Sequence, residues 1–238
     1  DLERSADGKY HIFPSSCPEW GGFGDKYWGR NDTLALSLIR YLIDGLLKAV
    51  EVLDINEPHA RSWQGMIHDL PSYATDETGL CVMEGIPYSH PSGHLSHLAP
   101  IYPCGDINID GPVEDINLIE SSVNNLVERG CSTWQGWAFA WASLVASRVG
   151  RGQMAYWTLK QLAESFVSCN TFNLNGDWKS NGLGRNSIAG KGSFVFSYCQ
   201  DGNMAAMAAI NEMLLQSWDG RIRVFPACPS HWRTVRFD

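Results

Sequence analysis

Apolar residues recur at helical spacing along most of this chain, and no other large-scale pattern competes with them. The clearest case follows Asn31 and Asp32, either of which suits a helix N-cap, with leucines at Leu34, Leu38 and Leu42. Further helical segments are predicted at residues 57–70, near Leu95, and at residues 113–128, 134–148, 153–167 and 203–217. Neither a strand–helix–strand alternation nor a nucleotide-binding glycine motif accompanies them. The chain is therefore predicted to be all-α and built of helical hairpins, as an α/α toroid or most of one.

Short segments of a different character separate and follow these helices. The Gly-, Asn- and Ser-rich stretch 169–200 predicts a long loop, which in a compact domain is usually functional or mobile. Residues 221–225 alternate between polar and apolar side chains and predict a strand, and residues 235–238 resemble the start of another. We therefore expect residues 1–220 to form part of the toroid, and residues 221–238 to begin a C-terminal β segment.

Charge and composition narrow the range of partners. Lys and Arg number 18 against 26 Asp and Glu, and the net charge of -8 argues against a nucleic-acid partner. With 44% hydrophobic and 18% charged residues, the chain has enough apolar material for a core. It lacks a membrane-spanning run of about 18 apolar residues, and its start at Asp1 has neither an initiator Met nor a signal-peptide layout. We expect a globular piece of a longer protein, with no nucleic-acid or membrane partner.

Tryptophan is the first residue type whose count points to a function. The chain has ten tryptophans, more than core packing alone needs, because a buried indole N–H requires a hydrogen-bond partner. Flat indole rings serve as stacking platforms in sugar-binding clefts. The alternative is that most of them, about six or seven, are ordinary core residues.

Glu19 is the first candidate for catalysis. It lies between Pro18 and Trp20 on a rigid turn with few local hydrogen-bond donors. Such an apolar environment raises a carboxyl pKa until the group can donate a proton near neutral pH. The alternative is a glutamate in a surface loop.

Asp201 is the second candidate, directly before an alanine-rich helix. The N-terminal amides of that helix would stabilise its anionic form, and a helix-capping role alone would also explain its position. Together with Glu19, however, it would supply the proton-donating acid and the ionised carboxylate that hydrolysis of a glycosidic bond requires.

Three histidines, His90, His94 and His97, lie within one short segment. They could ligate a metal, but no carboxylate or cysteine completes the set nearby, so we expect no metal. Imidazoles that bind hydroxyl groups in a polar cleft, or capping and core histidines, are the alternatives. The seven cysteines are widely spaced without a C-x-x-C pair, which argues against a disulfide framework and favours a reducing compartment.

Four segments together carry a resemblance to a known family. They are Pro14-Ser-Ser-Cys-Pro-Glu19, His94-Leu-Ser-His97, the helix start Trp134-Gln-Gly-Trp137-Ala-Phe-Ala-Trp141, and Asp201-Gly-Asn203 with the segment from Glu212 to Ser217. In order and approximate spacing they resemble the α-L-fucosidases of glycoside hydrolase family 95 over nearly the whole chain. This resemblance implies an (α/α)6 toroid, or a large part of one.

The resemblance also implies roles for particular residues. It implies an inverting hydrolase, without a cofactor, that removes terminal α-L-fucosyl or related L-sugar residues from oligosaccharides or glycoconjugates. Glu19 would match the general acid, and Asp201 the residue that helps polarise the attacking water. The sugar subsite would take its residues from the set His94, His97, Trp20, Trp134, Trp137, Trp141 and Asn203. In the family two asparagines hold that water, and they lie upstream of the residues present here, so the upstream part of the same parent protein is an expected partner and the isolated chain is expected to be incomplete.

Two departures from the family keep alternatives open. Gly93 stands where the family has a sugar-contacting Arg, and Trp20 where it has Asn. A related L-sugar such as L-galactose is therefore a possible substrate. A non-catalytic carbohydrate-binding relative, or a toroid glycosidase of another family such as an α-L-rhamnosidase, are the other functional alternatives. Cysteine usage favours the cytoplasm, whereas the resemblance favours a secreted or periplasmic enzyme.

Overall fold

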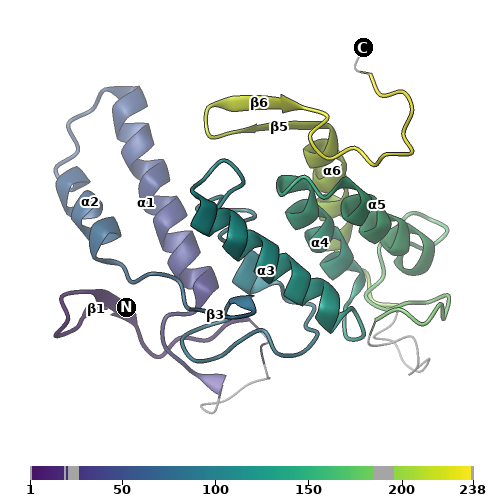
Figure 1. The fold of residues 1–238 in the computed structure, drawn as a ribbon, viewed down its shortest axis with the longest axis horizontal. Coiled ribbons are helices and arrows are strands. Elements are labelled where there is room, and N and C mark those ends of the chain that lie inside the picture. Colours follow the sequence, from purple (N-terminus) through teal and green to yellow (C-terminus); the bar gives the residue numbers. More distant parts are fainter. Residues whose placement is uncertain (1, 19, 21–26, 185–195, 237–238) are drawn as a thin grey trace. The chain divides into compact units, whose positions relative to one another are not determined.

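The computed structural model describes residues 2–18, 20, 27–184 and 196–236, and the chain divides into two compact units. The first comprises Asp1–Tyr88, Ser96–Ile107 and Gly111–Asn125, and the second Ser89–Leu95, Asn108–Asp110 and Leu126–Asp238. Helices dominate both units, and the strands of the described residues pair only as short two-stranded hairpins (Figure 1). The predicted all-α class with short strand insertions is confirmed.

The first unit is built around a helical hairpin. Its elements are β1 (Leu2–Arg4), β2 (Tyr10–Ile12), α1 (Thr33–Leu53), α2 (Ala60–Asp69), β3 (Thr75–Asp76), β4 (Gly79–Leu80), the 3-10 turn η2 (Ser96–Leu98) and most of α3 (Val113–Arg129). α1 and α2 lie side by side (Figure 1). As predicted, α1 begins after Asp32, whose carboxylate accepts a hydrogen bond from the Ala35 N–H at 2.9 Å. α2 begins only at Ala60, because residues 58 and 59 form a turn.

Close backbone contacts hold the loops of the first unit. Asn31 adopts a left-handed conformation, and its side-chain carbonyl accepts a hydrogen bond from the Ile12 N–H of β2 at 3.0 Å. Gly79, with φ of +114°, lets β4 approach α3 so closely that a Cβ there would lie 2.6 Å from the backbone nitrogen of Ser122. The fully buried side chains around these contacts include Leu36, Leu80, Tyr88, Leu98, Ile101 and Ile119.

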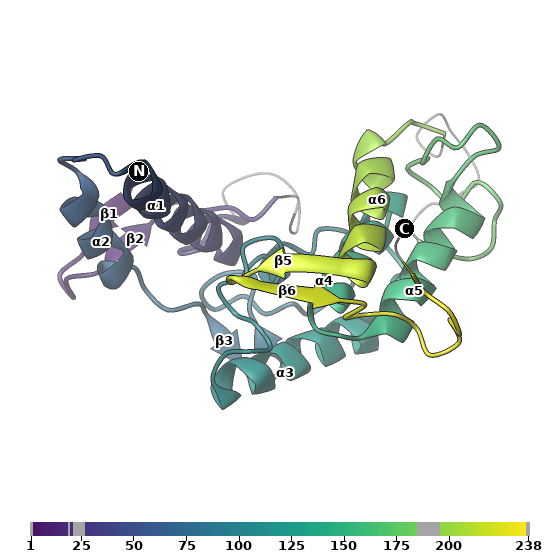
Figure 2. The same cartoon turned by 90° about the horizontal axis from the view of Figure 1, so that it is seen from above.

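The second unit is built around α4 (Gly136–Arg148). This helix contacts both α5 (Gly152–Gln161) and α6 (Gln200–Leu214), which stand beside it in Figure 2. Every residue of α4 is buried except Trp137 and Trp141. Its alanines, serines and glycine explain this burial, because small side chains let neighbouring helices approach closely on all sides.

The end of the second unit departs from the sequence prediction in one place. The helix predicted to reach Ser217 ends at Leu214, and the chain continues as β5 (Leu215–Trp218), which pairs with β6 (Arg221–Val224). The buried side chain of Gln216 donates to the carbonyl oxygens of Ser147 and Glu212, each at 2.9 Å, which fixes β5 in place. The strand predicted from residue 221 is confirmed, whereas residues 235 and 236 are irregular.

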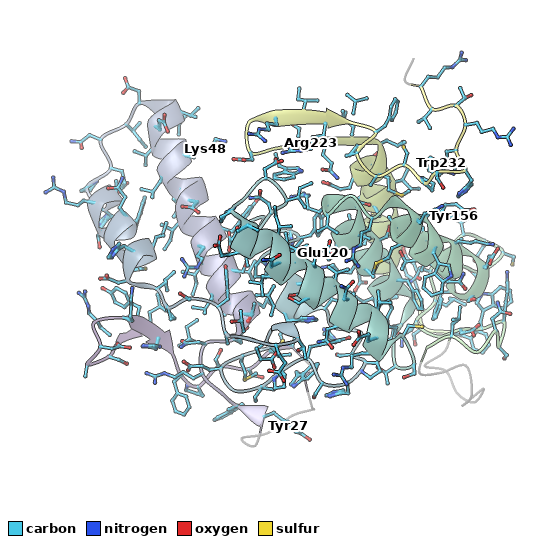
Figure 3. The ribbon with its side chains drawn as sticks, viewed as in Figure 1. Tyr27, Lys48, Glu120, Tyr156, Arg223 and Trp232 are labelled. Carbon is cyan, nitrogen blue, oxygen red and sulfur yellow. The ribbon has the colours of Figure 1, made fainter. Side chains whose placement is uncertain are left out.

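Two further segments complete the second unit. α5 continues into the π-helical turn η3 (Leu162–Phe166). The C-terminal tail returns to α5, where the ring of Trp232 lies 6.1 Å from that of Tyr156 (Figure 3). Both rings lie against a buried cluster that includes Ala146 and Met213, so the tail is part of the core of this unit.

Candidate active site

The predicted acid, Glu19, lies outside the described residues, but the residue that follows it is described. Trp20 is buried, and its ring lies 5.5 Å from that of Tyr88. Tyr88 in turn stacks on the imidazole of His97, with ring centroids 4.1 Å apart. Three rings therefore form a continuous series inside the first unit. No sequence pattern pointed to Tyr88, whose ring lies between the two predicted residues.

His97 lies in the interior of the first unit. Only 1% of its surface is exposed, and neither ring nitrogen has a hydrogen-bond partner among the described residues. Burial lowers the pKa of His97 to about 3, so the imidazole is neutral at physiological pH. In the described part of the chain His97 supports Tyr88, and its contact with a sugar stays a prediction.

Asp201 lies in the first turn of α6, at the positive end of the helix dipole. Its side chain is exposed and accepts a hydrogen bond from Cys199 Sγ at 3.4 Å. Burial, and secondly the charge of Asp201, raise the pKa of the Cys199 thiol to about 12, so this thiol keeps its proton and can donate it in a hydrogen bond. Cys199 rather than Asp201 occupies the N-cap position, so the alternative role of Asp201 as a helix cap is not realised.

Asn203 ties the same turn to the loop that precedes it. Its side-chain oxygen accepts a hydrogen bond from the Asn173 backbone N–H at 2.8 Å, and its amide donates to the Thr171 carbonyl at 2.9 Å. Both polar ends of this side chain are thus engaged within the protein. No role was predicted for Asn173 from the sequence, although it lies in the stretch 169–200 that was predicted to be a long loop.

His94, Trp137 and Trp141 form a partly exposed aromatic group on the second unit. The imidazole of His94 meets the ring of Trp137 edge-on at 4.7 Å, and the rings of Trp137 and Trp141 lie 6.1 Å apart. The two tryptophans are four residues apart, so they lie on one face of α4, and they are the residues of that helix that are not buried. These three predicted residues therefore come together at one surface.

Gly93 lies against a side chain that the sequence did not indicate. A Cβ at Gly93 would lie 2.2 Å from Gln135 Oε1, a buried oxygen without a hydrogen-bond partner among the described residues. The Gln135 side chain thus fills the space in which any side chain at position 93 would begin. A larger residue at position 93 would therefore require the end of the Gln135 side chain to move.

Trp134 is buried, unlike the other two tryptophans of its segment. Its ring meets that of Phe139 edge-on at 5.0 Å, and its surface contributes to an apolar pocket of about 390 Å³. Met154 and Trp157 of α5 line the same pocket. Trp134 is therefore placed as a packing residue of the second unit.

Neither a metal-binding group nor a membrane-spanning helix occurs in the part of the chain that the structure describes. Within residues 2–18, 20, 27–184 and 196–236, no three His, Cys, Asp or Glu side chains are grouped so as to hold a metal ion. Among the helices described, none is both long enough and apolar enough to cross a membrane.

Comparison with known proteins gives the chain its family. A profile of the glycosyl hydrolase family 95 catalytic domain matches residues 2–214, and a search of curated proteins returns no match. The helical hairpins of both units are accordingly part of the α/α toroid of that family. The chain therefore belongs to glycoside hydrolase family 95 and is a glycoside hydrolase with a glycan substrate.

Proposed function

We propose that this protein is an inverting hydrolase that removes terminal α-L-fucosyl or related L-sugar residues from glycans. Glu19 donates a proton to the departing glycosidic oxygen, and Asp201 helps to activate the water that attacks the opposite face of the sugar. The observation that carries this proposal is the combination of exposure and anchoring at Asp201. Its carboxylate is open to solvent, while the turn that bears it is bonded through Asn203 to the loop at Asn173.

The aromatic group of His94, Trp137 and Trp141 is proposed as a wall of the sugar subsite. An indole face packs against the apolar face of a pyranose ring, and an imidazole can bond to its hydroxyl groups. Partial exposure of all three side chains on an otherwise buried helix and its neighbouring segment supports this role. Trp134, which is buried in the same unit, would support this group by packing, and the buried Trp20 and His97 of the first unit are kept as proposed sugar-binding residues.

The replacement of the family arginine at Gly93 bears on the choice of sugar. Gly93 has no side chain, so a subsite at this position lacks the cation that the family uses there. This difference supports keeping L-galactosides beside L-fucosides as candidate substrates.

We also propose that residues 1–220 belong to the toroid and residues 221–238 begin a C-terminal β segment.

The experiment uses the complete enzyme with the toroid intact. The Glu19→Gln variant should lose about 100- to 10,000-fold in kcat with aryl and natural α-L-fucosides, because it lacks the transferable proton. Activated aryl fucosides should lose less, since their leaving groups need less protonation. Equal losses for good and poor leaving groups would argue against the acid role, and binding of the sugar without any hydrolysis would favour a carbohydrate-binding protein instead.

A crystal structure of the complete enzyme gives a second test. The carboxyl carbons of Glu19 and Asp201 should lie roughly 6.5 to 9.5 Å apart, or somewhat more if a held water extends the distance. Carboxylates on opposite faces of the fold would end the catalytic interpretation.

A further inference from the structure

Asn173 makes three hydrogen bonds that bracket the turn bearing Asp201. Its backbone N–H donates to Asn203 Oδ1 at 2.8 Å, and its side-chain amide donates to the Cys199 carbonyl at 2.9 Å. Its own carbonyl accepts from the Cys199 N–H at 3.0 Å. Cys199 and Asn203 lie two residues before and two residues after Asp201. The Cys199 backbone before the carboxylate and the Asn203 side chain after it are therefore both held by one residue.

The space around Asn173 leaves no freedom for its side chain to move. Asn173 is completely buried. A Cβ at Gly202, the residue next to Asp201, would lie 2.4 Å from Asn173 Nδ2. A Cβ at Gly136, the first residue of α4, would lie 2.2 Å from Asn173 Oδ1. The asparagine side chain is thus clamped between the first residues of α4 and α6, and both contacts need glycine.

The carboxylate itself is held much more weakly than its backbone. In the described part of the chain it accepts one bond, from the Cys199 thiol at 3.4 Å, and a thiol is a weak donor. The direction in which Asp201 points therefore depends on the backbone of the turn, which Asn173 holds.

We propose that Asn173 is a positioning residue that fixes the first turn of α6 and thereby directs the Asp201 carboxylate toward the attacking water. This inference rests on the proposed role of Asp201 in catalysis. Displacing a reacting group by about 1 Å costs on the order of 100-fold in rate. Loss of the Asn173 side chain should therefore reduce kcat without removing any group that touches the sugar.

The test compares Asn173→Ala, Gly202→Ala and the double variant in the complete enzyme, with 4-nitrophenyl α-L-fucoside as substrate. Each single variant should lose about 10- to 100-fold in kcat, while KM changes by less than about threefold. Gly202→Ala approaches the same contact from the helix side and improves helix propensity, so it tests the inference even if Asn173→Ala does not fold. Asn170 is an exposed asparagine of the same loop, so Asn170→Ala is the matched control and should keep the wild-type kcat.

The double variant shows whether the two substitutions lower kcat through the same contact or through independent effects. The three atoms nearest to a Cβ at Gly202 all belong to the Asn173 side chain, so the double variant should stay within about threefold of Asn173→Ala. Independent effects would instead multiply. A lowered melting temperature with unchanged kcat in the folded Asn173→Ala and Gly202→Ala enzymes would overturn the inference.

Asp201→Asn is measured in parallel and should lose about 100-fold or more in kcat. If Asp201→Asn is inactive while the Asn173 and Gly202 variants match the wild type, only the positioning role fails. If Asp201→Asn keeps wild-type activity, the proposed function fails as well.

Discussion

Acidification should destabilise this protein through His97, and the size of the effect follows from the burial of its ring. An unfolded histidine has a pKa of about 6.5, whereas burial lowers the pKa of His97 to about 3 in the folded protein. Between these values the unfolded chain binds a proton that the folded chain does not bind. The free energy of unfolding is therefore unaffected by His97 well above the unfolded pKa, and protonation of the unfolded chain lowers it as the pH falls below about 6.5.

The magnitude at one pH can be worked out directly. At pH of about 5 the proton bound by unfolded His97 favours unfolding by about 2 kcal/mol, and near pH 7 by only about 0.2 kcal/mol. The result does not depend on the exact folded pKa, provided that it stays well below 5. His97→Gln removes this contribution. The free energy of unfolding should therefore fall by about 2 kcal/mol less in this variant than in the wild type between pH 7 and pH 5.

Urea unfolding followed by far-UV circular dichroism at both pH values provides the measurement. His90→Gln is the control, because His90 is exposed on the surface of the folded protein. In the folded wild type the NMR resonances of the His97 ring should also stay unchanged between these pH values. Equal pH dependence in the wild type and His97→Gln would refute the reasoning and show that His97 takes up a proton in the folded protein, as a cleft residue would.

Three further predictions concern packing, thiol chemistry and the isolated chain. Gly79→Ala, at φ of +114°, should lower the free energy of unfolding by about 3 kcal/mol or more, because its Cβ would also meet the Ser122 backbone. Gly85→Ala, in open space at φ of +73°, should cost about 1 kcal/mol, and equal costs in urea unfolding would contradict this. Burial raises the pKa of the Cys17 thiol to about 12. Iodoacetamide at about pH 8 should therefore label the exposed Cys169 in the native chain, and Cys17 only after denaturation. Labelling of Cys17 in the native chain, detected by mass spectrometry, would contradict its burial. The 238-residue chain alone should be inactive on α-L-fucosides. It should also self-associate through the exposed Leu38, Leu42 and Leu46 of α1. A monomer with the turnover of the complete enzyme would disprove both statements.

Local sequence signals account well for the helices but less well for where they end. Asp32 predicts the start of α1 because the hydrogen bond that its carboxylate accepts from the Ala35 N–H spans only three residues. The end of α6 could not be predicted in the same way. The sequence of residues 211–217 predicts a helix. However, the Gln216 side chain donates to the carbonyl oxygen of Ser147, a residue 69 positions earlier, and residues 215–218 pair with β6 as a strand instead of continuing the helix.

The candidate site shows the same division between local and distant signals. Asp201 could be proposed from the sequence because its place at the start of an alanine-rich helix is a local property. Asn173 could not, because its partners Cys199 and Asn203 lie 26 and 30 residues away. The burial of His97 was hidden for the same reason: the spacing of His94 and His97 gives no sign that only one of them stacks on Tyr88 in the interior.

The stereochemistry of sugar release tests the central proposal most directly. The complete enzyme is mixed with 4-nitrophenyl α-L-fucoside in an NMR tube, and the anomeric proton of the released sugar is followed before mutarotation. A water activated with the help of Asp201 attacks from the face opposite the leaving group, so β-L-fucose should appear first and α-L-fucose only later. Initial release of α-L-fucose would contradict the assignment of Glu19 as acid and Asp201 as part of the water-activating system.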